Sequence, residues 1–210
     1  MWNSNPDRFS VLCIYYAALL NEPTIIFLFR FDVSANNPVG RYWGRVVSDY
    51  TFTSLDYGAN DEVIAVSDKN DVFSRMGLNE KTAGKNWKRI SKGFKSVSTS
   101  PYGYWLLNKD NRAYFSSYIS SKTVYPELKL ARIDGTFKKI SAGFGGNVWA
   151  LDLDGNVFRR RKVNTLTPSG SAWIQIGNLK LFDLAAGYDG VYGITPAGRI
   201  IRYTGLCDIY

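Results

Sequence analysis

The sequence contains no histidine and only two cysteines, Cys13 and Cys207, which lie near opposite ends of the chain. Without histidine, the Ser-His-Asp and Cys-His nucleophile systems, imidazole general bases and most zinc sites are excluded. Two widely separated cysteines form neither a zinc finger nor a Cys-x-x-Cys redox motif. We also find no convergent pair of acids. The sequence therefore argues against an enzyme, and we expect no catalytic residues, no cofactor and no metal site.

Long apolar runs are absent as well, since none reaches the roughly 20 residues that a membrane-spanning helix needs. Residues 9–20 resemble the apolar region of a signal peptide, but they lack a good small-residue cleavage site. There is no Asn-x-Ser/Thr sequon, so N-glycosylation is not expected. These features predict a protein without a transmembrane segment.

The residues that are abundant suit an all-β fold. The chain of 210 residues is 45% hydrophobic and 15% aromatic, with 19 Gly and 7 Pro. This is ample apolar surface for a core, and the β-branched and aromatic side chains favour short strands joined by tight turns. The length suits a single domain over residues 1–210.

The chain is basic, with 26 Lys and Arg against 18 Asp and Glu and a formal net charge of +8. This balance favours anionic partners, namely phosphorylated glycans, acidic membrane surfaces or nucleic acid, although it can also serve solubility alone. The basic residues concentrate in two segments: Lys81, Lys85, Lys88, Arg89, Lys92 and Lys95 in one, and Arg159, Arg160, Arg161 and Lys162 in the other. We interpret both first as solvated faces. Nucleic acid is the weakest of these partners, because aromatic residues do not alternate with the basic ones.

An internal repeat dominates the sequence. The pattern Trp/Leu-x-x-Ile/Val begins at Trp43, Trp87, Leu130 and Trp173, and it recurs every 43 or 44 residues. Within each period a small residue closes a short second strand, a compact apolar strand follows, and a polar turn leads to a last strand. The compact apolar strands are 63–66, 104–107, 148–151 and 191–194.

This period predicts a β-propeller, whose blades are four-stranded repeats of about 40–45 residues. We place the repeats at about 1–42, 43–86, 87–129, 130–172 and 173–210, which makes about five blades, with six as the alternative. In the divergent first repeat Trp2 takes the opening position, and strands are expected at 9–13, 17–20 and 25–31.

The turns between the last two strands of a repeat carry residues that accept a positive φ. Gly155 and Gly198 do so in two repeats, and Asn residues occupy the same place in the others. Asp152, Asp154 and Asn156 also resemble the start of a calcium loop, but the downstream Glu is missing, so a hairpin turn is the stronger interpretation.

Residues 137–143, 148–152 and 155–160 resemble the tectonin repeat, and 173–203 look like another copy. The resemblance extends over about 43–205. It implies a propeller that binds glycans, often on microbial surfaces, without catalysis, and it favours a secreted or extracellular protein over a cytoplasmic one. The repeat is superficially similar to that of the regulator of chromosome condensation too, but the His and Trp-Gly of that family do not recur here. Tectonin repeats are usually shorter, which leaves the blade number at five or six.

The loop between the second and third strands of a repeat is our candidate glycan site. In most repeats it places an aromatic ring beside an amide or an acid, which suits the apolar C–H face and the paired hydroxyls of a sugar. The candidate residues are Tyr57, Asn60, Asp61, Tyr102, Phe144, Asn147, Tyr188 and Asp189. The same composition is found in ordinary turns. A scaffold propeller that docks proteins or acidic membranes is therefore the alternative function.

The tryptophans are expected to pack. Trp105 and Trp149 lie in apolar strands and should be core, and the repeat-opening tryptophans should pack between blades. Residues two apart on a strand share a face, so we expect Arg45 and Arg89 to lie over Trp43 and Trp87. Ring closure would bring Cys13 and Cys207 together as a disulfide, with two buried free thiols as the alternative.

Overall fold

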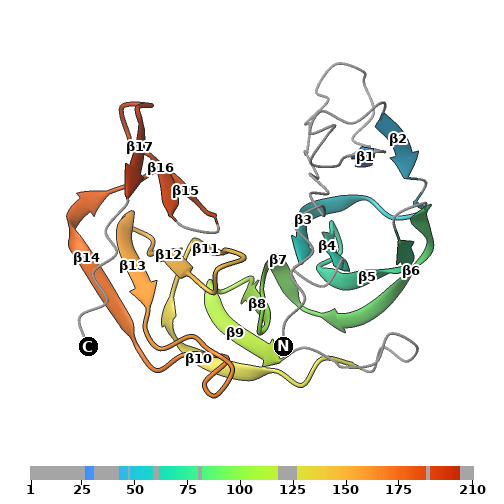
Figure 1. Cartoon of the computed structure of the whole chain (residues 1–210), viewed down its shortest axis with the longest axis horizontal. Coiled ribbons are helices and arrows are strands. Elements are labelled where there is room, and N and C mark those ends of the chain that lie inside the picture. The colour runs from blue at the N-terminus through green and yellow to red at the C-terminus, as the bar shows by residue number, and fades with distance from the viewer. Residues whose placement is uncertain are drawn as a thin grey trace, which may run out of the picture.

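The computed structural model describes residues 27–30, 43–46, 48–58, 62–79, 82–117, 127–187 and 190–203 (Figure 1). These residues form seventeen β-strands, and none of them is helical. The prediction of an all-β propeller is confirmed. No helix long and apolar enough to cross a membrane occurs among them.

The strands form five antiparallel sheets, four of which we name blades A to D. The first sheet pairs β1 (Phe27–Arg30) with β2 (Trp43–Val46). Blade A contains β3 (Phe52–Gly58), β4 (Glu62–Ser67), β5 (Asp71–Asn79) and β6 (Thr82–Lys92). Blade B contains β7 (Phe94–Ser100), β8 (Gly103–Asn108), β9 (Arg112–Ser117) and β10 (Ala131–Thr136). Blade C contains β11 (Lys139–Ala142), β12 (Val148–Leu151), β13 (Asn156–Arg160) and β14 (Trp173–Lys180), and blade D contains β15 (Asp183–Ala186), β16 (Val191–Ile194) and β17 (Ile200–Tyr203).

The blades follow one another along an arc (Figure 1). In each blade the strands run in chain order from the inside of the arc to the outside. The innermost strands contact one another from blade to blade, β3 with β7, β7 with β11, and β11 with β15. These strands therefore line the centre of the propeller, and the outermost strands β6, β10 and β14 form its rim.

The sheets have the period of the sequence repeat but not its phase. The strand that opens each repeat, at Trp87 or Trp173, is the outermost strand of the preceding blade. The sheet boundaries therefore lie one strand later than the repeat boundaries. Residues 1–26 of the first repeat lie outside the described residues, whereas β1 falls within the predicted strand 25–31.

The hydrophobic core lies between the blades. One cluster joins blades A and B through residues such as Ile64, Val66 and Leu106, and a second joins blades B and C through Trp105, Phe115 and Phe137. A third joins blades C and D, and a fourth holds Val46 of β2 against blade A. A strand that is short in isolation gains stability here because each blade is packed between neighbours.

The predicted turn chemistry is confirmed. The hairpins between the second and third strands of the four blades hold a positive φ at Asn70 (66°), Asn111 (63°), Gly155 (85°) and Gly198 (75°). In blade C the Asp152 carboxylate accepts hydrogen bonds from the backbone N–H groups of Asp154, at 3.0 Å, and Asn156, at 2.8 Å. This Asp acts within a hairpin turn. The described residues hold no group of three or more acidic or cysteine side chains that could bind a metal.

Trp105 and Trp149 are core residues, as predicted, with exposures of 0% and 4%. Trp173 packs between blades, with its ring 5.8 Å from Trp105 in blade B and 4.7 Å from Phe137. Its indole N–H donates to the carbonyl of Asp134 in β10 at 2.9 Å.

The expected stacking of Arg89 on Trp87 is wrong. The guanidinium over Trp87 comes from Arg75 on the neighbouring strand β5, at 5.2 Å, whereas Arg89 pairs with Asp71 at 3.7 Å. Arg75 and Trp87 are direct cross-strand partners. Such partners lie closer than residues two apart on one strand, so the register decides the contact.

Candidate functional site

The predicted loops join the first strand of each blade to the second, and they lie at one end of the innermost strands. Each loop closes a short hairpin. The last paired residues of these hairpins are Ser100 with Gly103, Ala142 with Val148, and Ala186 with Val191. Because the innermost strands contact one another, loops of successive blades come together. The described ends of these loops therefore lie along the same edge of the arc.

The innermost strands of blades A and B are joined by a carboxylate. Asp56 Oδ2 accepts hydrogen bonds from the Thr99 backbone N–H at 2.7 Å and from the Ser98 hydroxyl at 2.9 Å, and Oδ1 accepts from the Tyr57 N–H at 2.8 Å. Burial raises the pKa of the Asp56 carboxyl above its ordinary value of 3.8, although these hydrogen bonds oppose the shift.

A serine takes the same place at the next two junctions. Ser98 Oγ accepts from the Ala142 N–H at 3.0 Å, and Ser141 Oγ accepts from the Ala186 N–H at 2.9 Å. Asp56, Ser98 and Ser141 thus form a row of side-chain hydrogen bonds, which we call the ladder. It fixes how far each innermost strand is shifted along its axis relative to the next one. This ladder holds the loops of neighbouring blades in register.

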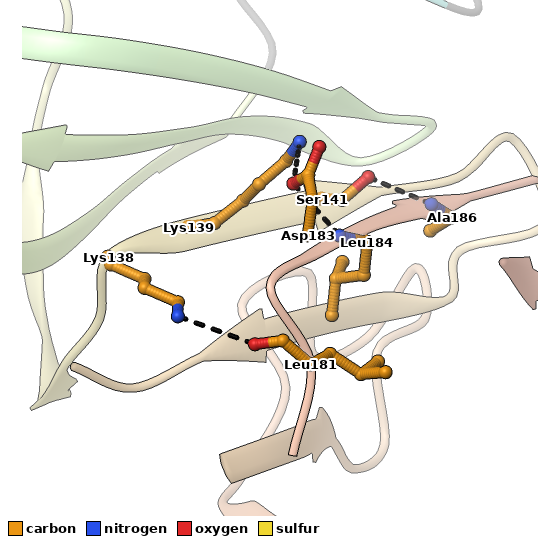
Figure 2. Close-up of polar contacts among 7 residues, drawn as sticks. All are labelled: Lys138, Lys139, Ser141, Leu181, Asp183, Leu184 and Ala186. Carbon is orange, nitrogen blue, oxygen red and sulfur yellow. Dashed lines mark hydrogen bonds and ion pairs between the residues drawn. The ribbon is translucent and has the colours of Figure 1, made fainter. Parts of the chain in front are cut away.

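Lysines reinforce the junction of blades C and D (Figure 2). Lys139 Nζ lies 2.5 Å from the Asp183 carboxylate, and Lys138 Nζ donates to the Leu181 carbonyl at 3.4 Å. Asp183 also accepts from the Leu184 N–H at 2.9 Å. The junction of blades C and D is therefore held by the ladder and also by an ion pair, which lies at the ends of β11 and β15 away from the loops.

The loop of blade B touches the loop of blade C. Tyr102 is half-buried, and a Cβ added to Gly146 would lie 2.8 Å from its ring. Only glycine allows this approach, and its φ of +78° is one that glycine adopts at low cost. Tyr102 therefore lies beside the backbone of the next loop.

The loop of blade C presents an exposed aromatic ring. Phe144 is 48% exposed and Asn147 is half-buried. The turn is closed by hydrogen bonds from the Gly146 N–H to the Gly143 carbonyl, at 3.0 Å, and from the Gly143 N–H to the Asn147 carbonyl, at 2.8 Å. An exposed apolar ring and an amide residue thus belong to one compact turn.

The loops of blades C and D meet through their backbones. A Cβ added to Gly143 would lie 2.0 Å from the carbonyl oxygen of Gly187. Of the other predicted site residues, Tyr57 is half-buried at the end of β3, and Asn60, Asp61, Tyr188 and Asp189 lie outside the described residues, as do Cys13 and Cys207. The structure thus brings Tyr102 next to the loop that carries Phe144 and Asn147.

One polar contact beside these loops was missed from the sequence. The buried Tyr104 hydroxyl of blade B donates to the Glu62 carboxylate of blade A at 2.5 Å. Each residue is the first or second of its strand, and they are 42 residues apart, close to the repeat period. The period could have paired them, but a Tyr in an apolar strand looks like core.

The basic segments lie away from these loops. Lys85, Lys88, Arg89 and Lys92 are exposed on the outermost strand β6, and Arg161 and Lys162 are exposed after β13. Arg160 is buried, and Lys95 bonds to Asn111. Most of these basic residues are therefore exposed at the rim of the propeller, while Arg160 and Lys95 are held by contacts within the fold. They do not gather into one binding site.

The family model of the Tectonin domain matches residues 29–194, which is well over half of the chain. This chain belongs to the Tectonin domain family. A fish-egg lectin of Cyprinus carpio is 25% identical over 125 residues, covering 58% of this chain and 52% of the lectin. The chain thus spans about half the length of this curated relative. The family match and the sheet arrangement identify the chain as a tectonin propeller.

Solved structures share the fold of this tectonin propeller. YCF48 from Cyanidioschyzon merolae superimposes with a TM-score of 0.58 at 12% identity, covering 86% of this chain and 64% of YCF48. Prp20p from Saccharomyces cerevisiae gives 0.53 at 14% identity, covering 85% and 52%. At these identities they show a common fold only.

Proposed function

We propose that this protein binds glycans through the loops between the first and second strands of its blades. The observation that carries the proposal is the exposed ring of Phe144 on the same compact turn as Asn147, a turn whose glycines approach both neighbouring loops. An exposed ring offers a surface for the C–H face of a sugar, and an amide provides both a donor and an acceptor for hydroxyls. Family membership and the lectin relative support the same function.

Binding in this proposal is multivalent. Corresponding loops recur in successive blades, so several shallow sites can engage one surface and gain avidity that no single site has. Blades C and D carry the loops that most resemble the tectonin pattern, and they should bind most strongly. The net charge of +8 suits glycans that carry phosphate, including microbial ones.

A glycan array identifies the sugar, and titration calorimetry with that sugar then tests the site. Phe144→Ala should weaken binding by roughly 2- to 10-fold, which corresponds to about 0.5–1.5 kcal/mol for an aromatic contact. Leu166→Ala is the matched control, because Leu166 is 91% exposed on the rim loop of blade C. Equal affinities for the Phe144 variant, the control and the wild type would place the site elsewhere.

Docking to acidic membranes is the second candidate, favoured by the exposed Lys85, Lys88 and Lys92 on β6. Sedimentation with vesicles of phosphatidylcholine, with and without phosphatidylserine, tests it. Binding that needs phosphatidylserine and is lost in Lys88→Glu, but not in Phe144→Ala, would favour this candidate over glycans.

A further inference from the structure

The rim loop of blade C, residues 161–172, presents a leucine to solvent. It joins β13 to the outermost strand β14. Leu166 in the middle of the loop is 91% exposed, the highest value among the exposed large hydrophobic residues in the described part of the chain. A single exposed leucine is common on protein surfaces. This one needs an explanation, because the loop around it is closely hydrogen-bonded and carries exposed cations.

Hydrogen bonds fix the backbone on both sides of Leu166. The Asn164 Oδ1 atom accepts from the backbone N–H groups of Leu166 and Thr167, each at 2.9 Å. At the base of the loop, the Arg161 N–H donates to the Ala172 carbonyl, also at 2.9 Å. The loop is therefore a defined turn that holds the Leu166 side chain in solvent.

Lys162 adopts a backbone conformation that is unfavourable for its residue type. Its φ is 54°, and the other non-glycine residues with a positive φ among the described residues are both asparagines, which tolerate the left-handed region. The Thr167 hydroxyl donates to the Lys162 carbonyl and so supports this conformation. Strain of this kind is concentrated where it serves a function. Here it fixes the position of a cation beside the turn that carries Leu166.

The residues around the loop carry charge of one sign. Positions 155–182 contain five Lys and Arg and no Asp or Glu. Arg161 and Lys162 at the start of the loop are both exposed, whereas Arg160 before them is buried against Trp173. An exposed apolar side chain next to exposed cations is typical of segments that meet an anionic lipid surface. The loop therefore has the composition of a membrane contact.

Leu153 provides a comparison at the opposite end of blade C. It lies in the turn between β12 and β13, is 59% exposed and is flanked by Asp152 and Asp154. Because β13 runs from this turn to the rim loop, the two leucines lie at opposite ends of one strand. An anionic surface repels the carboxylates beside Leu153, so it suits only the end that carries the rim loop.

The candidate glycan loop of blade C lies at the same end as the rim loop. The sheet has the order β11-β12-β13-β14, and each neighbouring pair is antiparallel. The loop between β11 and β12 and the loop between β13 and β14 therefore leave the sheet at the same end. A surface that meets Leu166 at this end also faces the loop that carries Phe144.

We propose that the rim loop of blade C docks on an anionic lipid bilayer. Leu166 enters the boundary between headgroups and acyl chains, and Arg161 and Lys162 lie at the level of the lipid phosphates. The candidate glycan loop of the same blade then faces the bilayer as well. Docking of this kind does not require a glycan, because lipid alone provides both contacts.

Sedimentation of the full chain with sugar-free vesicles of phosphatidylcholine, with and without phosphatidylserine, tests the docking. The chain should bind only the vesicles that contain phosphatidylserine. Leu166→Ser should weaken binding by roughly 5- to 20-fold, because it removes the side chain that enters the lipid. Lys162→Glu should weaken it by roughly 5- to 30-fold, because it reverses a charge next to the phosphates. Leu153→Ser is the matched control and should bind as the wild type does.

Wild-type affinity of Leu166→Ser would overturn the proposal, as would an equal loss for Leu153→Ser or a full chain that does not bind these vesicles. A loss in Lys88→Glu without a loss in Lys162→Glu would place the bilayer on β6 and would overturn it too. Titrations with free sugar should be unchanged in Leu166→Ser. Failure of lipid docking is therefore distinguishable from failure of glycan binding.

An added tryptophan locates the loop in the lipid. Leu166→Trp should keep its affinity, because an indole suits the membrane interface, and lipids brominated near the headgroup should quench its added fluorescence. Leu153→Trp contains the same six native tryptophans and should show no added quenching. Melting temperatures equal to that of the wild type check that both variants fold, since both positions are exposed. Equal quenching of the two variants would overturn the placement of Leu166 in the lipid.

Discussion

At the scale of single residues, two buried arginines anchor the rim of the propeller. Arg75 and Arg160 are each 7% exposed, stack on Trp87 and Trp173, and donate to a backbone carbonyl nine residues further along the chain. Burial lowers the pKa of both guanidinium groups, yet arginine stays charged at any ordinary pH. Arg75 thus ties β5 to the outer strand β6, and Arg160 ties β13 to the loop that leads to the outer strand β14.

Replacement of Arg160 by lysine should destabilise the protein by about 1–2 kcal/mol. Lysine keeps the charge but lacks the planar group that stacks on Trp173 while Nε bonds the Ser169 carbonyl at 2.9 Å. Urea unfolding measures the change, and Arg132→Lys, at an exposed position on β10, is the control. Equal stability of the two variants would contradict a role for the stacked geometry.

Asp56 gives the ladder a dependence on pH. Asp56→Ala should cost about 1–3 kcal/mol, because it leaves the Thr99 N–H without its acceptor. The pKa of Asp56 is raised in the folded state, so the folded protein holds the proton more tightly than the unfolded chain. The contribution of this proton to stability is therefore full below 3.8 and is lost as the pH rises through the raised pKa.

Urea unfolding at a series of pH values between about 4 and 7 measures this effect. The advantage of the wild type over Asp56→Ala should increase as the pH falls through this range. Asp154→Ala, at an exposed turn position, serves as the control. A constant difference between wild type and Asp56→Ala would show that the carboxyl does not titrate differently in the two states.

At the scale of strands and loops, the period was visible in the sequence but the sheet boundaries were not. A Trp that recurs every 43 or 44 residues shows the length of the unit, yet its spacing is the same whether its strand begins one sheet or ends another. Pairing decides the matter, and Trp173 pairs with Arg160 of the strand before it. The Arg89 prediction failed for the same reason, since it counted along one strand and ignored the neighbouring strand.

The candidate site was predictable in part. An aromatic residue next to glycines and amides was the sequence signal for the loop on which Phe144 is exposed. Tyr102 and Gly146 meet because the ladder sets the height of neighbouring blades, and this depends on hydrogen bonds between residues more than 40 positions apart. A single repeat contains no sign of that contact.

Gly143 and Gly187 provide a matched pair of loop variants. Gly143→Ala should force the loops of blades C and D apart, because its Cβ would lie 2.0 Å from the Gly187 carbonyl. Gly187→Ala should be tolerated, because its Cβ would meet nothing nearer than 3.5 Å. Melting temperatures and glycan titrations measure both, and we expect losses only for Gly143→Ala. A tolerated Gly143→Ala would mean that the two loops separate at little cost.

At the scale of the whole molecule, repeated sites predict that agglutination is more sensitive than single-site affinity. Asp189→Ala should weaken one site by roughly 10- to 150-fold, the equivalent of about 1.5–3 kcal/mol for a charge-assisted hydrogen bond. Agglutination of cells that carry the glycan should fall further, because avidity compounds the loss. If both Asp189→Ala and Tyr188→Ala bind the glycan with unchanged affinity, the site lies on other loops.

A disulfide between Cys13 and Cys207 would show that the first and last repeats are neighbours. If the first and last repeats are neighbours, Cys13 and Cys207 should form a disulfide in protein purified without reductant. Mass spectrometry after alkylation detects it. Alkylation of two free thiols in the unfolded, unreduced chain would contradict the bridge, and a Cys13→Ser variant of unchanged stability would show that the bridge is dispensable.

The sheet boundaries lie one strand later than the boundaries of the sequence repeats. This shift affects how a gene for such a protein can gain or lose repeats. Each unit donates its first strand to the blade before it, so excision of residues 87–129 would place β10 beside β5, where residues 87–92 of β6 had been. Every remaining sheet would keep its number of strands, and the array would lose one blade without exposing a new edge. Unequal recombination between units can therefore change the number of blades in single steps without leaving any sheet short of a strand.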